Sequence, residues 1–435
     1  MATRPNILLV TGHDFGRQLG CYGRGSAVSP RLDRLAAEGV RFDNAFATAP
    51  TCSPSRAALH TGRYPHSAGM MGFPYDAQGF RLTSNETHLA HLLRNAGYRT
   101  ALVGFQHLVV PGREADLGFD EAWPDDVKDG AAVAATAVDF LRRQDAAQPF
   151  YLELGFFQAH TDWASYPETG WAGEERSRGV TIPGFLPATP AVESYLAAFQ
   201  YGVRRLDEYV GTVLDALDQC GLAETTWVVV AADHGMPVTR AKGTLYDAGI
   251  EVTLLMRYPG LGLVGGRHVD ALVSNVDVVP TILDAVGARV PDGVDGRSLL
   301  PLLTGDTAQV RTEVFAEQTF CDDYAPMRCV RTDTHKLVYN AEAGYSISYD
   351  QDARLNPGHH DIQMRYRYLR PHFELYDLTA DPDEQRDTYR CDDARETAAD
   401  LRRRLRAWME DTGDPLLDGP VPSPFYHRGV RELLS

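Results

Sequence analysis

The chain has 435 residues and a formal net charge of −17, from 42 basic and 59 acidic side chains. Its hydrophobic fraction of 44% is that of a globular protein rather than a disordered one. The acidic balance argues against nucleic acid or an anionic membrane as a partner, because both would repel the average face of the protein.

No apolar run approaches the roughly 18 residues that a membrane helix needs. The apolar run Asn6–Thr11 near the N-terminus is too short for the core of a signal peptide, and no small-residue cleavage site follows it. We therefore expect no membrane span and a cytoplasmic location. The sequence does not indicate the oligomeric state.

Strand-like apolar runs alternate with amphipathic helical segments over the first 290 residues, which predicts an α/β fold with a large, mostly parallel sheet sandwiched by helices. The predicted strands cover residues 6–11, 99–104, 150–157 and 226–232. The predicted helices cover 30–38 (between Ser29 and Gly39), 86–96, 131–144, 192–220 and 278–286, the last capped by Asn275. Residues 158–190, rich in Pro, Gly and Trp, are predicted as a long loop.

The pattern changes after about residue 310. Strands without helices between them are predicted at 313–320, 327–332, 336–340 and 373–378, followed by one amphipathic helix at 394–410. This pattern is typical of a small α+β unit, an antiparallel sheet with one covering helix. We therefore divide the chain into a large α/β domain over residues 1–310 and a small C-terminal α+β subdomain over residues 311–435.

Polar side chains follow four of the predicted strands, directly where each strand ends. They are His13 and Asp14, His107, His160, and Asp233 with His234. The carboxyl ends of parallel strands meet at one edge of a sheet, where open α/β folds bind their ligands. Two Asp/His pairs at that edge predict a site for a hard cation with oxygen and imidazole ligands. Any single such residue is more often a turn or cap residue, so the prediction rests on all four strand ends together.

A second segment, TCSPSRAALHTGR, begins a predicted helix with Ser53 as its N-cap and Pro54 at its first position, and Gly62 ends it. Cys52 is therefore expected just ahead of a helix N-terminus, where unpaired N–H groups favour negative charge. Arg56, one turn later, could bind a tetrahedral oxyanion. These residues alone leave two interpretations open, a reactive or modified cysteine and a small buried hydrophobic residue beside a cap.

Lys242 is one of only three lysines and follows Asp233 and His234 by a short stretch. It could lie within reach of the predicted metal ligands, or it could be a solvated loop lysine. The sequence does not decide between the two.

These residues resemble the type I formylglycine-dependent sulfatase family of the alkaline-phosphatase superfamily. The Cys-x-Pro-Ser-Arg run, extended to Thr61-Gly62-Arg63, matches the sulfatase signature, with His60 where leucine is common. The resemblance extends over almost the whole chain. The strand 327–332 and the long insertion before Glu374 are similar to the branch that contains the N-sulfoglucosamine sulfohydrolases, the heparan sulfamidases.

The resemblance implies a hydrolase that releases sulfate from a sulfated sugar or similar small substrate, as an ester or a sulfamate. A formylglycine-generating enzyme would oxidise Cys52 to an aldehyde, whose hydrate attacks sulfur and then expels sulfate. A divalent metal, Ca²⁺ in most of the family with Mg²⁺ or Mn²⁺ as alternatives, would neutralise the developing charge. The implied metal ligands are His13, Asp14, Cys52, Asp233 and His234. The implied catalytic residues are Cys52, Arg56, His107, His160 and Lys242, of which Lys242 and His160 also bind substrate.

Two positions depart from the family pattern. His13 stands where the family has the first aspartate of a pair, so the site carries one negative charge fewer, and a neutral, softer imidazole weakens the preference for Ca²⁺. Phe105 stands where the family has a lysine, which removes a cation from the substrate pocket. These departures keep two alternatives open, a phosphonate monoester or phosphodiester hydrolase on the same scaffold and a catalytically silent anion-binding homologue.

Overall fold

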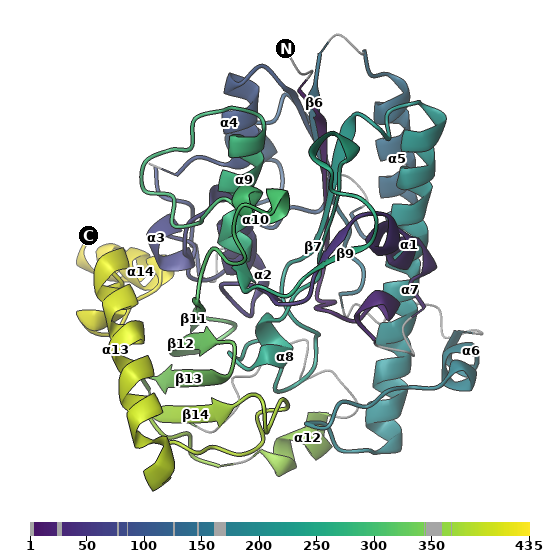
Figure 1. Cartoon of the computed structure of the whole chain (residues 1–435). Coiled ribbons are helices and arrows are strands. Elements are labelled where there is room, and N and C mark those ends of the chain that lie inside the picture. Colours follow the sequence, from purple (N-terminus) through teal and green to yellow (C-terminus); the bar gives the residue numbers. More distant parts are fainter. Residues whose placement is uncertain are drawn as a thin grey trace.

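The computed structural model describes all residues except 1–3, 24–27, 76–77, 85, 125–126, 146–147, 161–170, 343, 345–358 and 367. Two sheets organise the described chain (Figure 1). The larger one has eight strands in the order β5-β4-β6-β1-β7-β8-β2-β9. Its strands are β1 (Asn6–Gly12), β2 (Val40–Phe42), β4 (Arg99–Gly104), β5 (Glu121–Trp123), β6 (Phe150–Gly155), β7 (Thr226–Ala232), β8 (Leu254–Arg257) and β9 (Arg267–Val269). β3 (Ala45–Phe46) and β10 (Val273–Ser274) form a separate short pair.

The centre of the large sheet is parallel, as the sequence predicts. β1 pairs in parallel with β6 and β7, and β6 pairs in parallel with β4. Only β8 runs antiparallel to its neighbours β7 and β2 among the described strands of this sheet. The central strands are almost wholly buried, which explains their continuous apolar runs, since helices cover both faces.

Helices lie on both sides of this sheet (Figure 1). One face carries α1 (Pro30–Glu38), α5 (Gly130–Arg142) and the long α7 (Pro190–Gln219). The other carries α2 (Cys52–Thr61), α4 (Leu89–Asn95) and α9 (Val278–Ala285). Shorter helices are α3 (Pro65–Ala68), α6 (Trp171–Arg178), α8 (Asp247–Ile250), α10 (Leu300–Thr304) and α12 (His359–Arg365). Among the described residues no helix is both long and apolar enough to cross a lipid bilayer.

The second sheet is antiparallel, with its four strands in chain order: β11 (Glu313–Phe320), β12 (Tyr324–Thr332), β13 (His335–Asn340) and β14 (Phe373–Asp377). The amphipathic helix α13 (Arg395–Thr412) packs its Leu401, Leu405 and Trp408 against this sheet. These elements confirm the predicted α+β unit, and α14 (Pro424–Leu434) follows them. The boundary between residues 310 and 311 stays a prediction.

Four predictions of local structure are wrong. The helix predicted to start at residue 86 begins at Leu89, because the His88 side chain accepts a hydrogen bond from the Ala90 N–H and caps it. Asn275 is not the cap of α9; Ser274 forms a capping box with Asp277 ahead of that helix. The predicted loop 158–190 contains α6, although residues 161–170 lie outside the described chain. The predicted run of strands after residue 310 is interrupted by α12, between β13 and β14.

Candidate active site

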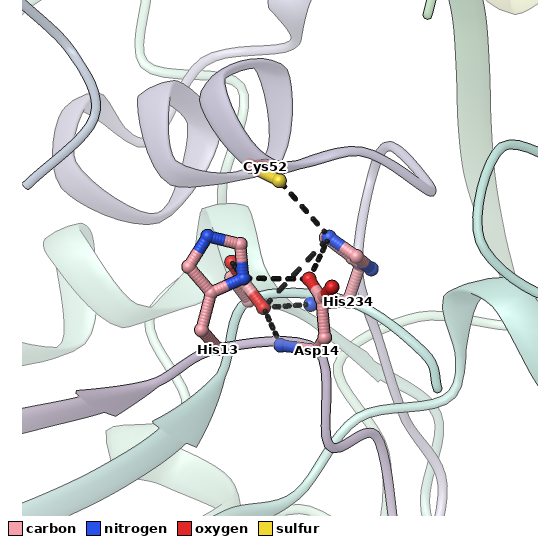
Figure 2. Close-up of side chains that lie close together, drawn as sticks. His13, Asp14, Cys52 and His234 are labelled. Carbon is pink, nitrogen blue, oxygen red and sulfur yellow. Dashed lines mark hydrogen bonds and ion pairs between the residues drawn. The ribbon is translucent and has the colours of Figure 1, made fainter. Parts of the chain in front are cut away.

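The polar ends of the four parallel strands meet at one edge of the large sheet. His13 and Asp14 follow β1, and Asp233 and His234 follow β7, while Cys52 reaches them from α2. One potential ligand atom from each of these five side chains lies within 4.8 Å of those from the other four, and all five residues are buried. Figure 2 shows Cys52 above the space into which Asp14 and His234 point. The predicted convergence of the strand ends is therefore confirmed.

The start of α2 differs from the prediction by two residues. Thr51 is the N-cap and Cys52 is the first helical residue, so Ser53 and Pro54 lie inside the first turn. Ser53 does not cap the helix; its hydroxyl donates to the backbone oxygen of His107 at 2.6 Å. Gly62, with a φ of 72°, ends the helix as predicted. Cys52 thus lies directly at the positive end of the helix dipole.

Both carboxylates of the cluster are paired with a buried cation. Asp14 Oδ2 accepts from Lys242 Nζ at 2.8 Å, and Asp233 Oδ2 accepts from Arg56 Nε at 3.1 Å. Burial would raise the pKa of Asp14, but Lys242 and the neighbouring histidines outweigh it and hold the pKa well below its usual value. His234, His13 and Arg56 lower the pKa of Asp233 against the same burial. Both groups are therefore ionised at neutral pH.

The two imidazoles are oriented toward these carboxylates. His234 Nδ1 donates to its neighbour's backbone oxygen, Gly235 O, at 3.0 Å, which leaves Nε2 facing Asp14 Oδ1 at 2.9 Å and Cys52 Sγ at 3.4 Å. A backbone acceptor on the second ring nitrogen is the usual support of a metal-binding histidine. Burial lowers the pKa of His13 to about 4 despite the two carboxylates, so His13 is neutral.

This donor set fits a divalent cation. It offers two ionised carboxylates, a neutral imidazole and a second imidazole whose tautomer is fixed by Gly235. In the metal-free chain, burial would lower the pKa of His234, but Asp233 and Asp14 outweigh it and raise the pKa. A bound cation would take the place of the proton on Nε2.

Arg56 holds one unused donor. Its Nη1 donates to Thr11 Oγ1 at 3.1 Å, whereas the buried Nη2 has no hydrogen-bond partner among the described residues. Phe105, which replaces the family's lysine, lies with its ring centroid 5.1 Å from the Arg56 guanidinium and 5.0 Å from the His13 ring. The cation of the family pattern is therefore replaced by an apolar ring that packs against Arg56 and His13, both of which are buried.

The two remaining histidines lie beside the cluster. His160 Nε2 is 3.9 Å from Asp14 Oδ2, and its ring centroid is 4.4 Å from that of His13. Burial, with His13 and Arg56 nearby, holds the pKa of His107 well below its ordinary value. His107 and Asp14 both have left-handed backbone angles, with φ of 66° and 59°, a conformation that clusters at functional sites.

Two further contributors are missed by the sequence reasoning. Asn275 donates from Nδ2 to Ser55 O at 3.1 Å and to Ser55 Oγ at 2.9 Å, and the Ser55 hydroxyl donates to Asp233 O. This link ties α2 to the end of β7. The other is Tyr75, whose ring lies 5.3 Å from that of His107. An asparagine at a helix start is indistinguishable from a cap in sequence, and a loop tyrosine carries no spacing signal.

Comparison with known proteins identifies the class. The family model described as Sulfatase matches residues 5–288, and the model described as N-sulphoglucosamine sulphohydrolase, C-terminal, matches residues 238–354. The chain therefore belongs to the sulfatase family, hydrolases of sulfate esters or S–N bonds, which confirms the resemblance seen in the sequence.

Individual relatives refine this assignment. Human N-sulphoglucosamine sulphohydrolase is 31% identical over 470 residues, covering 96% of this chain and 92% of the relative. Human arylsulfatase A is 30% identical over 432 residues, covering 88% and 83%. The second family model and the first of these relatives support the predicted branch.

Solved structures support the fold. A protein solved in complex with its substrate D-glucosamine-2-N,6-O-disulfate superposes with a TM-score of 0.73 at 20% identity, covering 96% of this chain and 99% of that one. Phosphonate monoester hydrolase of Agrobacterium radiobacter gives a TM-score of 0.74 at 21% identity, covering 94% and 96%. Both confirm the predicted alkaline-phosphatase-like architecture.

Proposed function

We propose that the chain releases sulfate from a sulfated amino sugar, with residue 52 acting as a formylglycine beside a divalent cation. The observation that carries the proposal is the position of Cys52, at the N-terminus of α2 and within one cluster of carboxylate and imidazole atoms. The amino sugar is inferred from human N-sulphoglucosamine sulphohydrolase and from the similar protein solved with D-glucosamine-2-N,6-O-disulfate. The cytoplasmic location and maturation by a formylglycine-generating enzyme are parts of the same proposal.

Asp14, Asp233, His234 and residue 52 would hold the cation, with the neutral His13 as a further ligand. Ca²⁺ suits the carboxylate oxygens, and the imidazoles leave Mg²⁺ or Mn²⁺ as alternatives. When bound, the cation supplies Lewis acidity and neutralises charge that builds up on the sulfuryl oxygens. Once oxidised, residue 52 supplies a hydrated aldehyde as the nucleophile, and the Cys52 thiol stands where one of its hydroxyls would lie.

Two cations of the chain would bind the anionic group. Arg56 offers its unpartnered Nη2 to the oxygen on residue 52. Lys242 Nζ, held 2.8 Å from Asp14 Oδ2, would contact the sulfate from the far side. A sulfate monoester carries a single negative charge, which these two cations of the family pattern would still neutralise although Phe105 replaces the lysine.

Proton movement would fall to the two histidines. His107 is neutral because its pKa is held low, so it can accept a proton from residue 52 as sulfate departs. The His160 side chain is 16% exposed, at the mouth of the cluster, and can donate a proton to the departing sugar oxygen or nitrogen.

The test is sulfate release, measured by ion chromatography, from a panel of sulfated monosaccharides after co-production with a formylglycine-generating enzyme. We expect turnover to be highest on N-sulfated or 6-O-sulfated glucosamine and absent in Cys52→Ala. Turnover of phosphodiesters with none of the sulfated sugars would refute the proposal.

That outcome would favour the second candidate, a phosphonate monoester or phosphodiester hydrolase. Phe105 supports this second candidate, because a pocket with one cation fewer also suits a monoanionic phosphodiester. A chain that binds sulfate but turns over neither class would favour the silent anion-binding homologue.

A further inference from the structure

An exposed aromatic side chain lies at the edge of the active site and has no role in the chemistry described above. Tyr75 is 42% exposed, yet its ring centroid is 5.3 Å from the ring of His107. Phe73 lies beneath it, with its ring 5.5 Å from His107 and 6.4 Å from Tyr75, close to parallel with both. We name Phe73 and Tyr75 together the aromatic ledge.

The ledge is held in place by the loop that carries it. The Gln78 side chain accepts from the Phe73 N–H at 2.7 Å and donates to the backbone oxygen of Cys321 at the end of β11. Phe80 N–H donates to Phe73 O, and Gln78 N–H donates to Tyr75 O, each at 3.0 Å. These bonds hold the backbone at Tyr75 in place before any ligand arrives, which reduces the entropy lost on binding.

The phenol of Tyr75 is neutral. Burial, together with Cys52, raises the pKa of Tyr75 to about 12, and Arg56 opposes the rise. The phenol therefore keeps its proton at physiological pH, beside the ring of His107. A neutral phenol offers an apolar face and a hydrogen-bonding tip, the combination that suits a sugar ring with its apolar C–H face and its hydroxyl rim.

We propose that the aromatic ledge is the binding subsite for the sugar ring of the substrate, with the face of Tyr75 stacked on the face of the pyranose next to its sulfated atom. This inference rests on the proposed function, since it places the sugar beside the sulfate group held by Arg56 and Lys242. Phe73 supports Tyr75 from below and contacts the sugar little, because it is itself half-buried.

The experiment measures binding rather than turnover. In a Cys52→Ala background, calorimetry with the metal present gives dissociation constants for glucosamine N-sulfate and for inorganic sulfate. We expect Tyr75→Ala to weaken binding of the sulfated sugar about tenfold, the effect of roughly 1.4 kcal/mol of lost stacking, and to leave inorganic sulfate within twofold. Tyr75→Phe should retain sugar binding within threefold, because the stacking face remains.

Tyr426→Ala is the matched control, since it removes a 61% exposed tyrosine from α14 and should change neither constant. If Tyr75→Ala weakens the binding of both ligands equally, Tyr75 only shields His107 and the proposed subsite is wrong. Unchanged binding of the sulfated sugar would also overturn the subsite. A parent chain that binds inorganic sulfate but no sulfated sugar would refute the proposed substrate and the ledge together. The two failures are thus distinguishable.

Discussion

Two buried groups of histidines and carboxylates lie near the two ends of α2, and they resemble each other in composition. The first is the cluster of Asp14, Asp233, His13 and His234 at the N-terminus of the helix, with Cys52. The second consists of His60, His88 and Glu153, whose ligand atoms also lie within 4.8 Å of one another. We call them the front cluster and the back cluster.

The hydrogen bonds of the histidine ring nitrogens differ between the front cluster and the back cluster. In the front cluster, His234 donates from Nδ1 to a backbone oxygen and keeps Nε2 for a cation. In the back cluster, His88 Nδ1 accepts from the Ala90 N–H at 3.1 Å, so a neutral His88 carries its proton on Nε2, the atom that faces Glu153. That nitrogen has no lone pair to offer a metal.

The back cluster is instead balanced by its own charges. His60 Nδ1 donates to Arg56 O at 2.7 Å, and His60 Nε2 lies 3.0 Å from Glu153 Oε1, so both ring nitrogens face an oxygen of the protein. Tyr151 donates to the other oxygen of Glu153 at 2.8 Å. Burial would raise the pKa of Glu153, but His60 outweighs it and lowers the pKa to about 2. The same residue types thus make a site in one place and a structural ion pair in the other.

The largest expected effect concerns residue 52. Cys52→Ala removes the proposed nucleophile, so sulfate release should fall at least a thousandfold, because removing a covalent catalytic group costs that much or more. Cys391→Ala, which removes a half-buried thiol far along the chain, should keep the rate within twofold. Comparable rates in the two variants would show that the front cluster does not act through residue 52.

Metal content should distinguish the clusters next. We expect elemental analysis to find one divalent ion per chain, and chelation to abolish activity that Ca²⁺ then restores. Asp233→Asn should lose the ion, whereas His88→Asn should keep it. A second equivalent of metal that disappears in His88→Asn would contradict the hydrogen-bond argument for the back cluster.

Stability should respond most to the back cluster. Glu153→Gln breaks the buried contact between the Glu153 carboxylate and His60, so the free energy of unfolding should fall by about 3–5 kcal/mol in denaturant titrations. The double variant His60→Leu/Glu153→Leu removes both polar partners and should recover much of that loss. A single variant as stable as the parent chain would mean that the contact between Glu153 and His60 does not stabilise the fold.

The smallest effect is a pH dependence. Burial lowers the pKa of His88 to about 3, against 6.5 when unfolded, so the unfolded chain binds the proton first as pH falls. The contribution of His88 to the free energy of unfolding is therefore fully present above pH 6.5. It should fall by about 1 kcal/mol between pH 6.5 and 5.5. His88→Asn retains a capping side chain and should flatten that part of the pH profile; an unchanged slope would contradict the assignment.

Much of the front cluster can be predicted from the sequence, because a strand pattern and the signature around Cys52 each lie within a short stretch of residues. The strand ends that carry Asp14 and Asp233 follow from runs of buried residues, and the segment around Cys52 resembles a known signature. The back cluster could not be predicted, since His60, His88 and Glu153 come from α2, the start of α4 and β6, and only the packed fold brings them together. The shift in the start of α2 has a similar cause, because the Ser53 hydroxyl is recruited by His107 rather than by its own helix.

The most direct test of the account is the mass of the tryptic peptide that spans residues 42–56. After co-production with a formylglycine-generating enzyme, we expect residue 52 to have lost its sulfur and gained an aldehyde, and sulfate release per chain to rise in proportion to the converted fraction. Full activity from a chain whose residue 52 is still an intact thiol would contradict the claim that residue 52 acts as a formylglycine.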